Sequence, residues 1–242
     1  PWLTGWSAFA AEKRARGDAP WWDWQGAPRA HDEDRLVEDA IQFLYFEQIA
    51  RLRGVAREHG VLLVGDLPIF VARDSADVHA WPSIFQLDER GQPQAVAGVP
   101  PDAFSELGQL WGNPLYDWAA LQAQDFAWWR LRVRFLLEQV DLVRIDHFRG
   151  FAAAWAVPAS AEDARSGAWV PGPGRALFEA LRDELGTDDL PFIAEDLGVI
   201  TPDVEALRDG LNLPGMRILQ FAFDGNPDNS YLPHHHSARS VV

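Results

Sequence analysis

The chain has 242 residues, of which 48% are hydrophobic, 12% aromatic and 24% charged, the composition of an ordinary globular domain. These values exclude collagen-like, coiled-coil and disordered chains, and the longest apolar runs fall far short of the ~20 residues of a membrane-spanning helix. The net charge of −15 disfavours nucleic acid and membrane surfaces as partners and suits a neutral substrate. Cysteine is absent, which excludes disulfides, thiolate nucleophiles and cysteine-based zinc sites.

The predicted elements alternate between helix and strand along the chain. Residues 1–29 alternate Trp, Gly and Pro and predict a loop with a short helix. From Asp34 to His59 apolar residues recur at helical spacing, Gly60 stands where a C-terminal cap belongs, and residues 61–64 (VLLV) then resemble a buried parallel strand. The same order repeats in three further units, with helices at 125–138, at 176–185 and from 201, and strands at 140–145, 191–194 and 216–222.

Helix-to-strand units joined by right-handed crossovers predict an α/β fold with a parallel sheet. Two forms fit this pattern, an open doubly wound sheet and a (β/α)8 barrel. Four strands make half a barrel, residue 1 is Pro, and residues 240–242 resemble the start of a strand, so we expect an excerpt from a longer chain. Residues 73–118, rich in Trp, Pro, Gly and Gln, predict a loop-rich insertion within a single partial domain of residues 1–242.

Each predicted strand is closely followed by an acidic residue: Asp66, Asp146, Glu195 and Asp224. In both candidate folds the C-terminal edge of the parallel strands is where ligands bind and catalysis occurs. Four such acids in succession indicate a functional site at this edge. The alternative, that an acid caps the helix that follows it, stays open for each of them.

Two of these acids suit glycoside chemistry, which needs one ionised and one protonated carboxyl group. Arg144 lies two residues before Asp146, so both side chains point to one side of a strand, and the guanidinium favours the ionised carboxylate. Glu195 follows the apolar residues 192–194, and partial desolvation there favours its protonated form. A plain ion pair between Arg144 and Asp146 is the alternative. The sequence contains no phosphate-binding glycine loop, GxSxG elbow or HExxH motif.

Tryptophan and histidine residues supply further candidates. Neutral sugars present flat C–H faces that pack on indole rings, and Trp111 and Trp81 lie in the polar insertion where such contacts are expected. Trp128 and Trp129, on a predicted helix, are expected in the core. The run His234-His235-His236 is interpreted as loop histidines, because adjacent residues rarely converge on one metal ion.

Five short motifs are specific enough in combination to suggest a family: residues 64–71 (VGDLPIFV), 100–102 (PPD), 111–116 (WGNPLY), 143–150 (VRIDHFRG) and 193–198 (IAEDLG). Together they resemble the 4-α-glucanotransferases, also called amylomaltases or disproportionating enzymes. The similarity runs in order from about residue 34 to the last residue. These enzymes are similar to α-amylases, so the resemblance implies the central portion of an interrupted (β/α)8 TIM barrel that needs no cofactor and no metal ion.

The resemblance also implies a role for individual residues. Asp146 would be the nucleophile and Glu195 the general acid/base. The other implied site residues bind or border the sugar, and they are Asp66, Arg144, His147, Gln109, Trp111 and Asp102, the last at the start of a mobile active-site loop at 102–108. A third catalytic carboxylate is expected in a Thr-His-Asp motif shortly after the segment that resembles residues 237–242.

The implied activity is transfer of α-1,4-glucan segments between maltodextrins, through a covalent intermediate and with retention of configuration. The expected partners are α-1,4-glucan donors and sugar acceptors, and the expected location is the cytoplasm. Retention predicts that the carboxyl groups of Asp146 and Glu195 lie about 5–5.5 Å apart. Three alternatives stay open: an α-glucan hydrolase, a maltodextrin-binding fragment without catalysis, and a metal-dependent barrel enzyme using Asp66, Asp146, His147 and Glu195.

Overall fold

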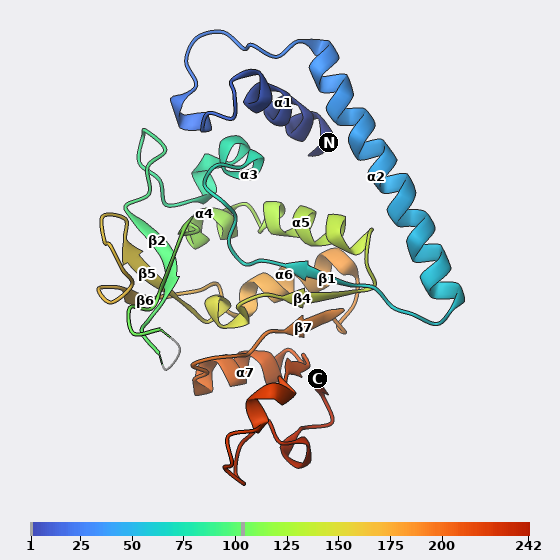
Figure 1. Ribbon diagram of the computed structural model, residues 1–242, viewed down its shortest axis with the longest axis vertical. Coiled ribbons are helices and arrows are strands. Elements are labelled where there is room, and N and C mark those ends of the chain that lie inside the picture. The colour runs from blue at the N-terminus through green and yellow to red at the C-terminus, as the bar shows by residue number, and fades with distance from the viewer. Residues whose placement is uncertain (1, 103–104) are drawn as a thin grey trace.

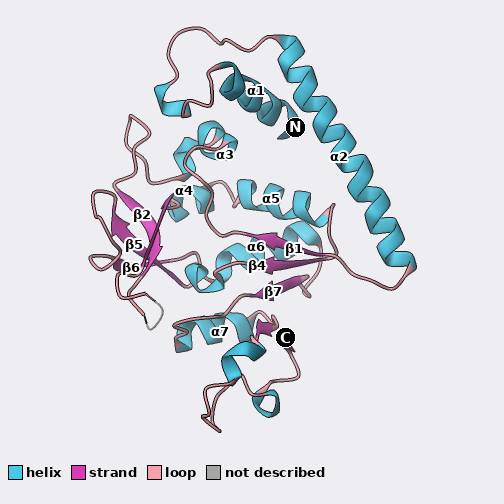
Figure 2. Ribbon diagram, viewed as in Figure 1, coloured by secondary structure: helices cyan, strands magenta, loops and turns pink. Residues whose placement is uncertain are grey.

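The computed structural model, which describes residues 2–102 and 105–242, contains a parallel sheet, an antiparallel sheet and several helices (Figures 1 and 2). The helices are α1 (Trp2–Ala15), α2 (Asp32–Glu58), α3 (Ala76–Ala80), α4 (Trp118–Ala123), α5 (Ala127–Leu137), α6 (Arg175–Leu185) and α7 (Pro202–Gly210). The strands are β1 (Val64–Leu67), β2 (Ala95–Val99), β3 (Gln109–Pro114), β4 (Leu142–Ile145), β5 (Ala153–Pro158), β6 (Ala168–Pro171), β7 (Phe192–Ala194), β8 (Gly215–Met216) and β9 (Ser240–Val241). Short 3-10 helices lie at η1 (Trp21–Asp23), η2 (Pro82–Ile84), η3 (Phe148–Phe151), η4 (Leu219–Ala222) and η5 (Pro233–His235).

The parallel sheet has the strand order β1-β4-β7-β8-β9, and its strand pairs all run in the same direction. Each of its first three strands follows a helix in the chain, as the helix-to-strand pattern predicts. The strand expected from residues 240–242 is also confirmed, because β9 pairs with β8 through Ser240 and Val241. The chain therefore has a mixed α/β architecture with a parallel sheet at its centre.

One face of the parallel sheet packs against helices α5 and α6. Val143 and Ile145 of β4 are buried in a cluster that includes Val133 of α5 and Phe178 of α6. Side chains alternate along a strand, so the residues between the buried ones point to the opposite face. The largest buried side chains each contribute about 1.5–3 kcal/mol to stability, and they include Trp129, Tyr116, Phe148, Phe151 and Phe178. Trp128 and Trp129 are both buried, which confirms their expected place in the core.

The segment 73–118 is more regular than its sequence predicts. It contains α3 and the strands β2 and β3, which belong to an antiparallel sheet of order β3-β2-β5-β6 at the side of the molecule (Figure 1). The hairpin of β5 and β6 has no counterpart in the sequence prediction. Its first strand reads AAWAVP, and alanine has little preference for strands, so its conformation depends on pairing with β2.

The first predicted strand lies a few residues later in the chain than expected. The apolar run 61–64 predicts a buried strand, whereas the observed strand is Val64–Leu67, and Val61 and Leu62 are exposed. The first residue of β4, Leu142, pairs with Val64, so the residues before Val64 have no paired residue in β4 and extend beyond the sheet.

The last predicted strand, at 216–222, is wrong over most of its length. β8 ends at Met216, and Leu219–Ala222 forms a 3-10 helix. Asp224 therefore lies away from the end of β8, and its carboxylate accepts a hydrogen bond from the Asn226 N–H at 2.9 Å in a turn. The prediction that an acid follows the end of each strand is therefore wrong for Asp224.

Helix α2 runs along one side of the molecule (Figure 1), and the local sequence sets both of its ends. The His31 N–H donates to the Asp34 carboxylate at 2.8 Å at its start, and Gly60 with a φ of +68° reverses the chain after its end. In the part of the chain that the structure describes, none of the helices has the length and apolar character needed to cross a bilayer. Several large apolar side chains of α2 are exposed, among them Leu36, Ile41, Phe43, Leu44, Leu52 and Val55.

Candidate functional site

Polar side chains gather on the face of the parallel sheet that points away from α5 and α6. The register of β1 and β4 pairs Asp66 with Arg144, and the register of β4 and β7 pairs Arg144 with Ile193. Residues paired in parallel strands point to the same face. Asp66 thus lies within β1, and it shares a face with Arg144.

Asp146 and Glu195 extend the same face by one residue beyond the ends of β4 and β7. The Asp146 N–H donates to the Leu67 carbonyl at 3.0 Å, and the Glu195 N–H donates to the Ile145 carbonyl at 3.0 Å. These bonds continue the ladder past each strand end, and neighbouring parallel strands lie about 4.8 Å apart. The two acids therefore start from adjacent positions at the carboxyl edge of the sheet.

Arg144 joins two of the predicted site residues. Its Nη1 donates to Asp66 Oδ1 at 2.6 Å, and its Nη2 donates to Asp146 Oδ1 at 2.8 Å. Partial burial lowers the pKa of Arg144, but the hydrogen bond to Asp66 and the charge of Asp146 outweigh this effect and raise it. The predicted pairing of Arg144 with Asp146 is confirmed. The carboxylates are 56% and 39% exposed, so each pair adds at most about 1 kcal/mol to stability.

Glu195 has surroundings unlike those of Asp146. It is 9% exposed, its Oε2 accepts the His147 N–H at 2.7 Å, and its Oε1 accepts the Leu197 N–H at 3.0 Å. Burial raises the pKa of the Glu195 carboxyl, and the charge of Asp146 raises it further, against the lowering effect of the two N–H donors and of Arg144. The expected burial of Glu195 is confirmed, and it changes the pKa in the expected direction.

His147 turns the chain sharply after Asp146. Its backbone is in the left-handed region, with a φ of 50°, and its N–H donates to Glu195 Oε2. Its ring meets the Trp111 ring edge-on, with 4.8 Å between centroids. Its Nε2 is buried and has no hydrogen-bond partner among the described residues. Burial, helped by the positive charge of Arg149, lowers the pKa of His147 to about 4.

Trp111 and Gln109 reach this group from β3 of the antiparallel sheet. The Trp111 Nε1 donates to Gln109 Oε1 at 3.0 Å, and the Trp111 side chain stays 37% exposed. Trp111 therefore offers an open ring next to His147. Trp81, the other tryptophan candidate, is partly buried and packs against the hydrophobic core.

Asp102 lies on the connection between β2 and β3. Its carboxylate accepts the Ser105 N–H at 2.9 Å, and its own N–H donates to the Ser105 carbonyl at 3.0 Å, which closes a turn. Residues 103 and 104 of the expected active-site loop at 102–108 lie outside the described residues. The role of Asp102 stays a prediction.

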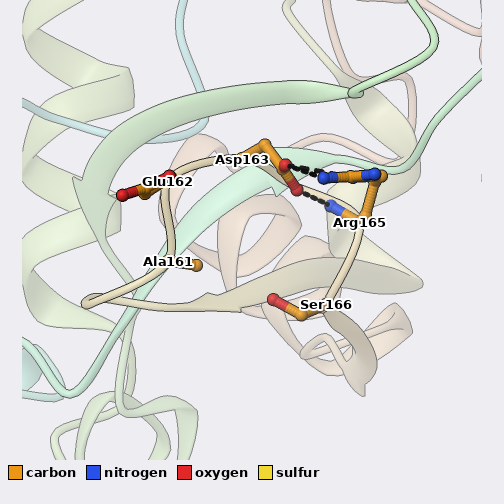
Figure 3. Close-up of a pocket in the computed structure, with 5 residues that line it drawn as sticks. All are labelled: Ala161, Glu162, Asp163, Arg165 and Ser166. Atoms are coloured by element: carbon orange, nitrogen blue, oxygen red, sulfur yellow. Dashed lines mark hydrogen bonds and ion pairs between the residues drawn. The ribbon is translucent and has the colours of Figure 1, made fainter.

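Surface hollows lie elsewhere on the molecule. One is on the connection between β5 and β6, where Arg165 donates to the Asp163 carboxylate at 2.7 Å, and it is lined by Ala161, Glu162, Asp163, Arg165 and Ser166 (Figure 3). A second borders β2, β5 and β6 and includes Gln86 and Gln94. The predicted site residues line neither of these two hollows.

His235 and His236, near the end of the chain, contact backbone carbonyl oxygens. His235 Nε2 lies 3.2 Å from the Pro227 carbonyl, and His236 Nε2 lies 2.8 Å from the Tyr231 carbonyl. Over residues 2–102 and 105–242, no three His, Asp or Glu side chains gather in a way that could hold a metal ion.

Comparison with known proteins agrees with this arrangement. A family model described as 4-alpha-glucanotransferase matches residues 1–242. The chain belongs to the 4-alpha-glucanotransferase family. Relatives of that name from Thermus thermophilus and Synechocystis are each 48% identical over the whole chain. A solved structure, the amylomaltase from Streptococcus agalactiae in complex with acarbose, is 36% identical over 99% of the chain with a TM-score of 0.90. The chain spans about half the length of these relatives, 50% of the first two and 51% of the third.

Two residues in the 4-alpha-glucanotransferase motifs have contacts that sequence reasoning misses. Asp196 points away from Glu195, as alternation along a strand predicts, and its carboxylate binds Arg208 of α7 and the Met216 N–H. Arg149 is buried in η3, and its signal in the sequence is a charged residue within the apolar run 148–151 (FRGF).

Proposed function

We propose that the whole protein containing this chain is a 4-α-glucanotransferase that transfers α-1,4-glucan segments from maltodextrin donors to sugar acceptors. The observation that carries this proposal is the contrast between two acids at neighbouring strand ends. Asp146 is ion-paired with Arg144 and partly exposed to solvent, which suits a nucleophile, whereas Glu195 is buried with a raised pKa, which suits a proton donor. The family membership and the acarbose complex of a relative support the same substrate class.

The reaction has two displacements. The Asp146 carboxylate attacks the anomeric carbon while the glycosidic C–O bond breaks and Glu195 gives its proton to the departing oxygen. The 4-hydroxyl of an acceptor sugar then gives a proton to Glu195 and attacks the same carbon, which releases Asp146. Two inversions at one carbon retain its configuration.

We assign supporting roles to the remaining predicted residues. Arg144 and Asp66 offer hydrogen-bonding groups on the same sheet face, and Trp111 offers an aromatic surface beside His147. We assign the bound sugar to the space over these residues. Gln109 would contact a neighbouring sugar ring from β3, and Asp102 would act from the connection before it.

We further propose that residues 1–242 are part of one interrupted (β/α)8 catalytic domain, with 73–118 bordering the active site. The parallel strand order and the end position of β1 support this, because a barrel needs a further strand there. The exposed apolar side chains of α2 offer surface for the rest of such a domain. A cytoplasmic location stays a prediction, since relatives include bacterial enzymes and plant enzymes named as chloroplastic.

The test uses the full-length protein that contains this chain, incubated with maltotriose, and separates the products by chromatography. Transfer yields glucose together with oligosaccharides longer than maltotriose, whereas hydrolysis yields glucose and maltose without longer products. Glu195→Gln is expected to lower kcat by about 10²–10⁴-fold because the proton donor is lost. Asp146→Asn is expected to abolish transfer.

Asp224→Asn is the matched control, because Asp224 is an exposed acid in a turn away from β8. Mass spectrometry of Glu195→Gln should also detect a glycosyl adduct on Asp146. Hydrolysis products alone would favour the α-glucan hydrolase. Full transfer by Asp146→Asn, or an equal loss in Asp224→Asn, would contradict the proposed roles.

A further inference from the structure

Arg149 is a buried cation in contact with two other segments of the chain. It is 6% exposed, its Nη1 donates to the Val199 carbonyl, and its Nη2 donates to Thr201 Oγ1 at 3.4 Å. Its guanidinium carbon lies 3.8 Å from the centre of the Trp169 ring in β6. Its Nε is buried and without a hydrogen-bond partner within the described ranges.

This environment is costly for a charge. Burial lowers the pKa of Arg149, and Asp203 offsets this only through attraction at longer range. A carbonyl, a hydroxyl and an aromatic ring satisfy the guanidinium incompletely, as the unpartnered Nε indicates. An apolar residue of similar size would fill the same space at lower cost. The contacts of Arg149 therefore indicate that the arginine does more than fill space in the core.

The segments that Arg149 joins are those that hold Glu195. Arg149 itself lies in the turn after β4, two residues beyond His147, whose N–H donates to Glu195 Oε2. Val199 lies in the segment after β7, two residues beyond Leu197, whose N–H donates to Glu195 Oε1. The two donors thus come from two segments, and Arg149 links these segments through residues 149 and 199, each two residues beyond a donor.

We propose that Arg149 is a positioning residue that fixes the segment 195–201 against the turn after β4, and so holds the Glu195 carboxyl between its two N–H donors. This inference rests on the proposed function only in taking Glu195 as the acid/base. Without the bridge, the segment 195–201 moves relative to His147, and Glu195 loses one or both donors. Those donors favour the ionised form, so their loss raises the pKa of Glu195.

The test measures kcat, KM and the pH profile of transfer from maltotriose in the full-length protein and in Arg149→Met. Met fills the space and packs on Trp169 but donates no hydrogen bond. We expect kcat to fall by about 10²-fold, since displacement of a reacting group by about 1 Å has that effect. KM should stay within a few-fold, and the basic limb of the profile should move to higher pH.

Other groups that act on Glu195 stay unchanged in this variant, namely Asp146, Arg144 and Tyr231. Loss of the Arg149 charge also acts on His147, but the pKa of that residue is about 4, below the basic limb. Arg165→Met is the matched control, because Arg165 pairs with Asp163 on the surface connection in Figure 3. It should leave kcat and the basic limb unchanged.

A second variant covers the case in which Arg149→Met does not fold. Arg149→Lys keeps the charge but has a single donor nitrogen that cannot reach both Val199 and Thr201, so a smaller fall in kcat and a smaller shift of the limb are expected. A folded Arg149→Met or Arg149→Lys with the wild-type kcat and limb overturns the proposal. The two failures can be told apart. If only the role of Arg149 is wrong, the unaltered protein still transfers glucan. If the proposed function is wrong, the unaltered protein shows no transfer.

Discussion

Replacing Asp196 by Ala is expected to destabilise the protein far more than changing its neighbour Glu195. The Asp196 side chain is 2% exposed, and its Oδ1 accepts the Met216 N–H at 2.7 Å. Its Oδ2 binds Arg208 of α7 and lies 3.4 Å from Arg217 Nη1. This carboxylate therefore ties β7, α7 and β8 together.

The size of the effect follows from what Asp196→Ala leaves behind. Removing one partner of a buried ion pair costs about 3–5 kcal/mol, chiefly because the other charge stays buried without a partner. The side chains of Arg208 and Arg217 are 14% and 23% exposed, so water reaches part of each guanidinium. We therefore expect Asp196→Ala to lower the free energy of unfolding by about 3 kcal/mol, the lower end of this range. Asp196→Asn keeps an acceptor for the Met216 N–H and should lose less.

The measurement is the free energy of unfolding in urea for the full-length protein and these variants. Glu195→Gln is the control, because it keeps the size of the side chain and one acceptor for its N–H donors, so the loss should stay below about 1.5 kcal/mol. The two variants would then affect different quantities: Asp196→Ala lowers the free energy of unfolding, and Glu195→Gln lowers kcat. A smaller loss of stability for Asp196→Ala than for Glu195→Gln would refute this reasoning.

The other predictions concern one histidine and two glycines. Because burial lowers the pKa of His147 to about 4, the folded state binds fewer protons than the unfolded state below pH ~6.5, so stability is full above that pH and is lost as the pH falls toward 4. Urea unfolding at pH 7 and pH 4.5 should show a smaller loss for His147→Gln than for the unaltered protein, and equal losses would contradict the assignment. Gly215→Ala should lower the free energy of unfolding by about 1–3 kcal/mol, since its Cβ would lie 2.5 Å from Asp196 Oδ2. Gly54→Ala in α2, where a Cβ meets nothing within 4 Å, should raise it by up to about 1 kcal/mol, and a common sign for the two glycine variants would contradict the packing argument.

Features that depend on neighbours along the chain could be predicted from the sequence. Gly60 after α2 and the Thr201-Pro202 start of α7 act within one or two turns, and both were found where the sequence indicates. The acids at the ends of β4 and β7 follow from apolar runs that stop at Asp146 and Glu195. Parallel pairing then brings these two ends to one edge, because parallel strands share a direction.

The sequence by itself determined the helix-to-strand order and the two acids at the sheet edge, since periodicity and the ends of apolar runs are local properties. Only the tertiary structure decided that β8 stops at Met216, that an alanine-rich segment becomes β5, and that Glu195 and Asp196 have different surroundings. Each of these depends on partners distant in the chain, such as Arg208 for Asp196 and the His147 N–H for Glu195. Adjacent carboxylates look alike in a sequence, and only contacts made by folding give them different hydrogen-bond and ion-pair partners.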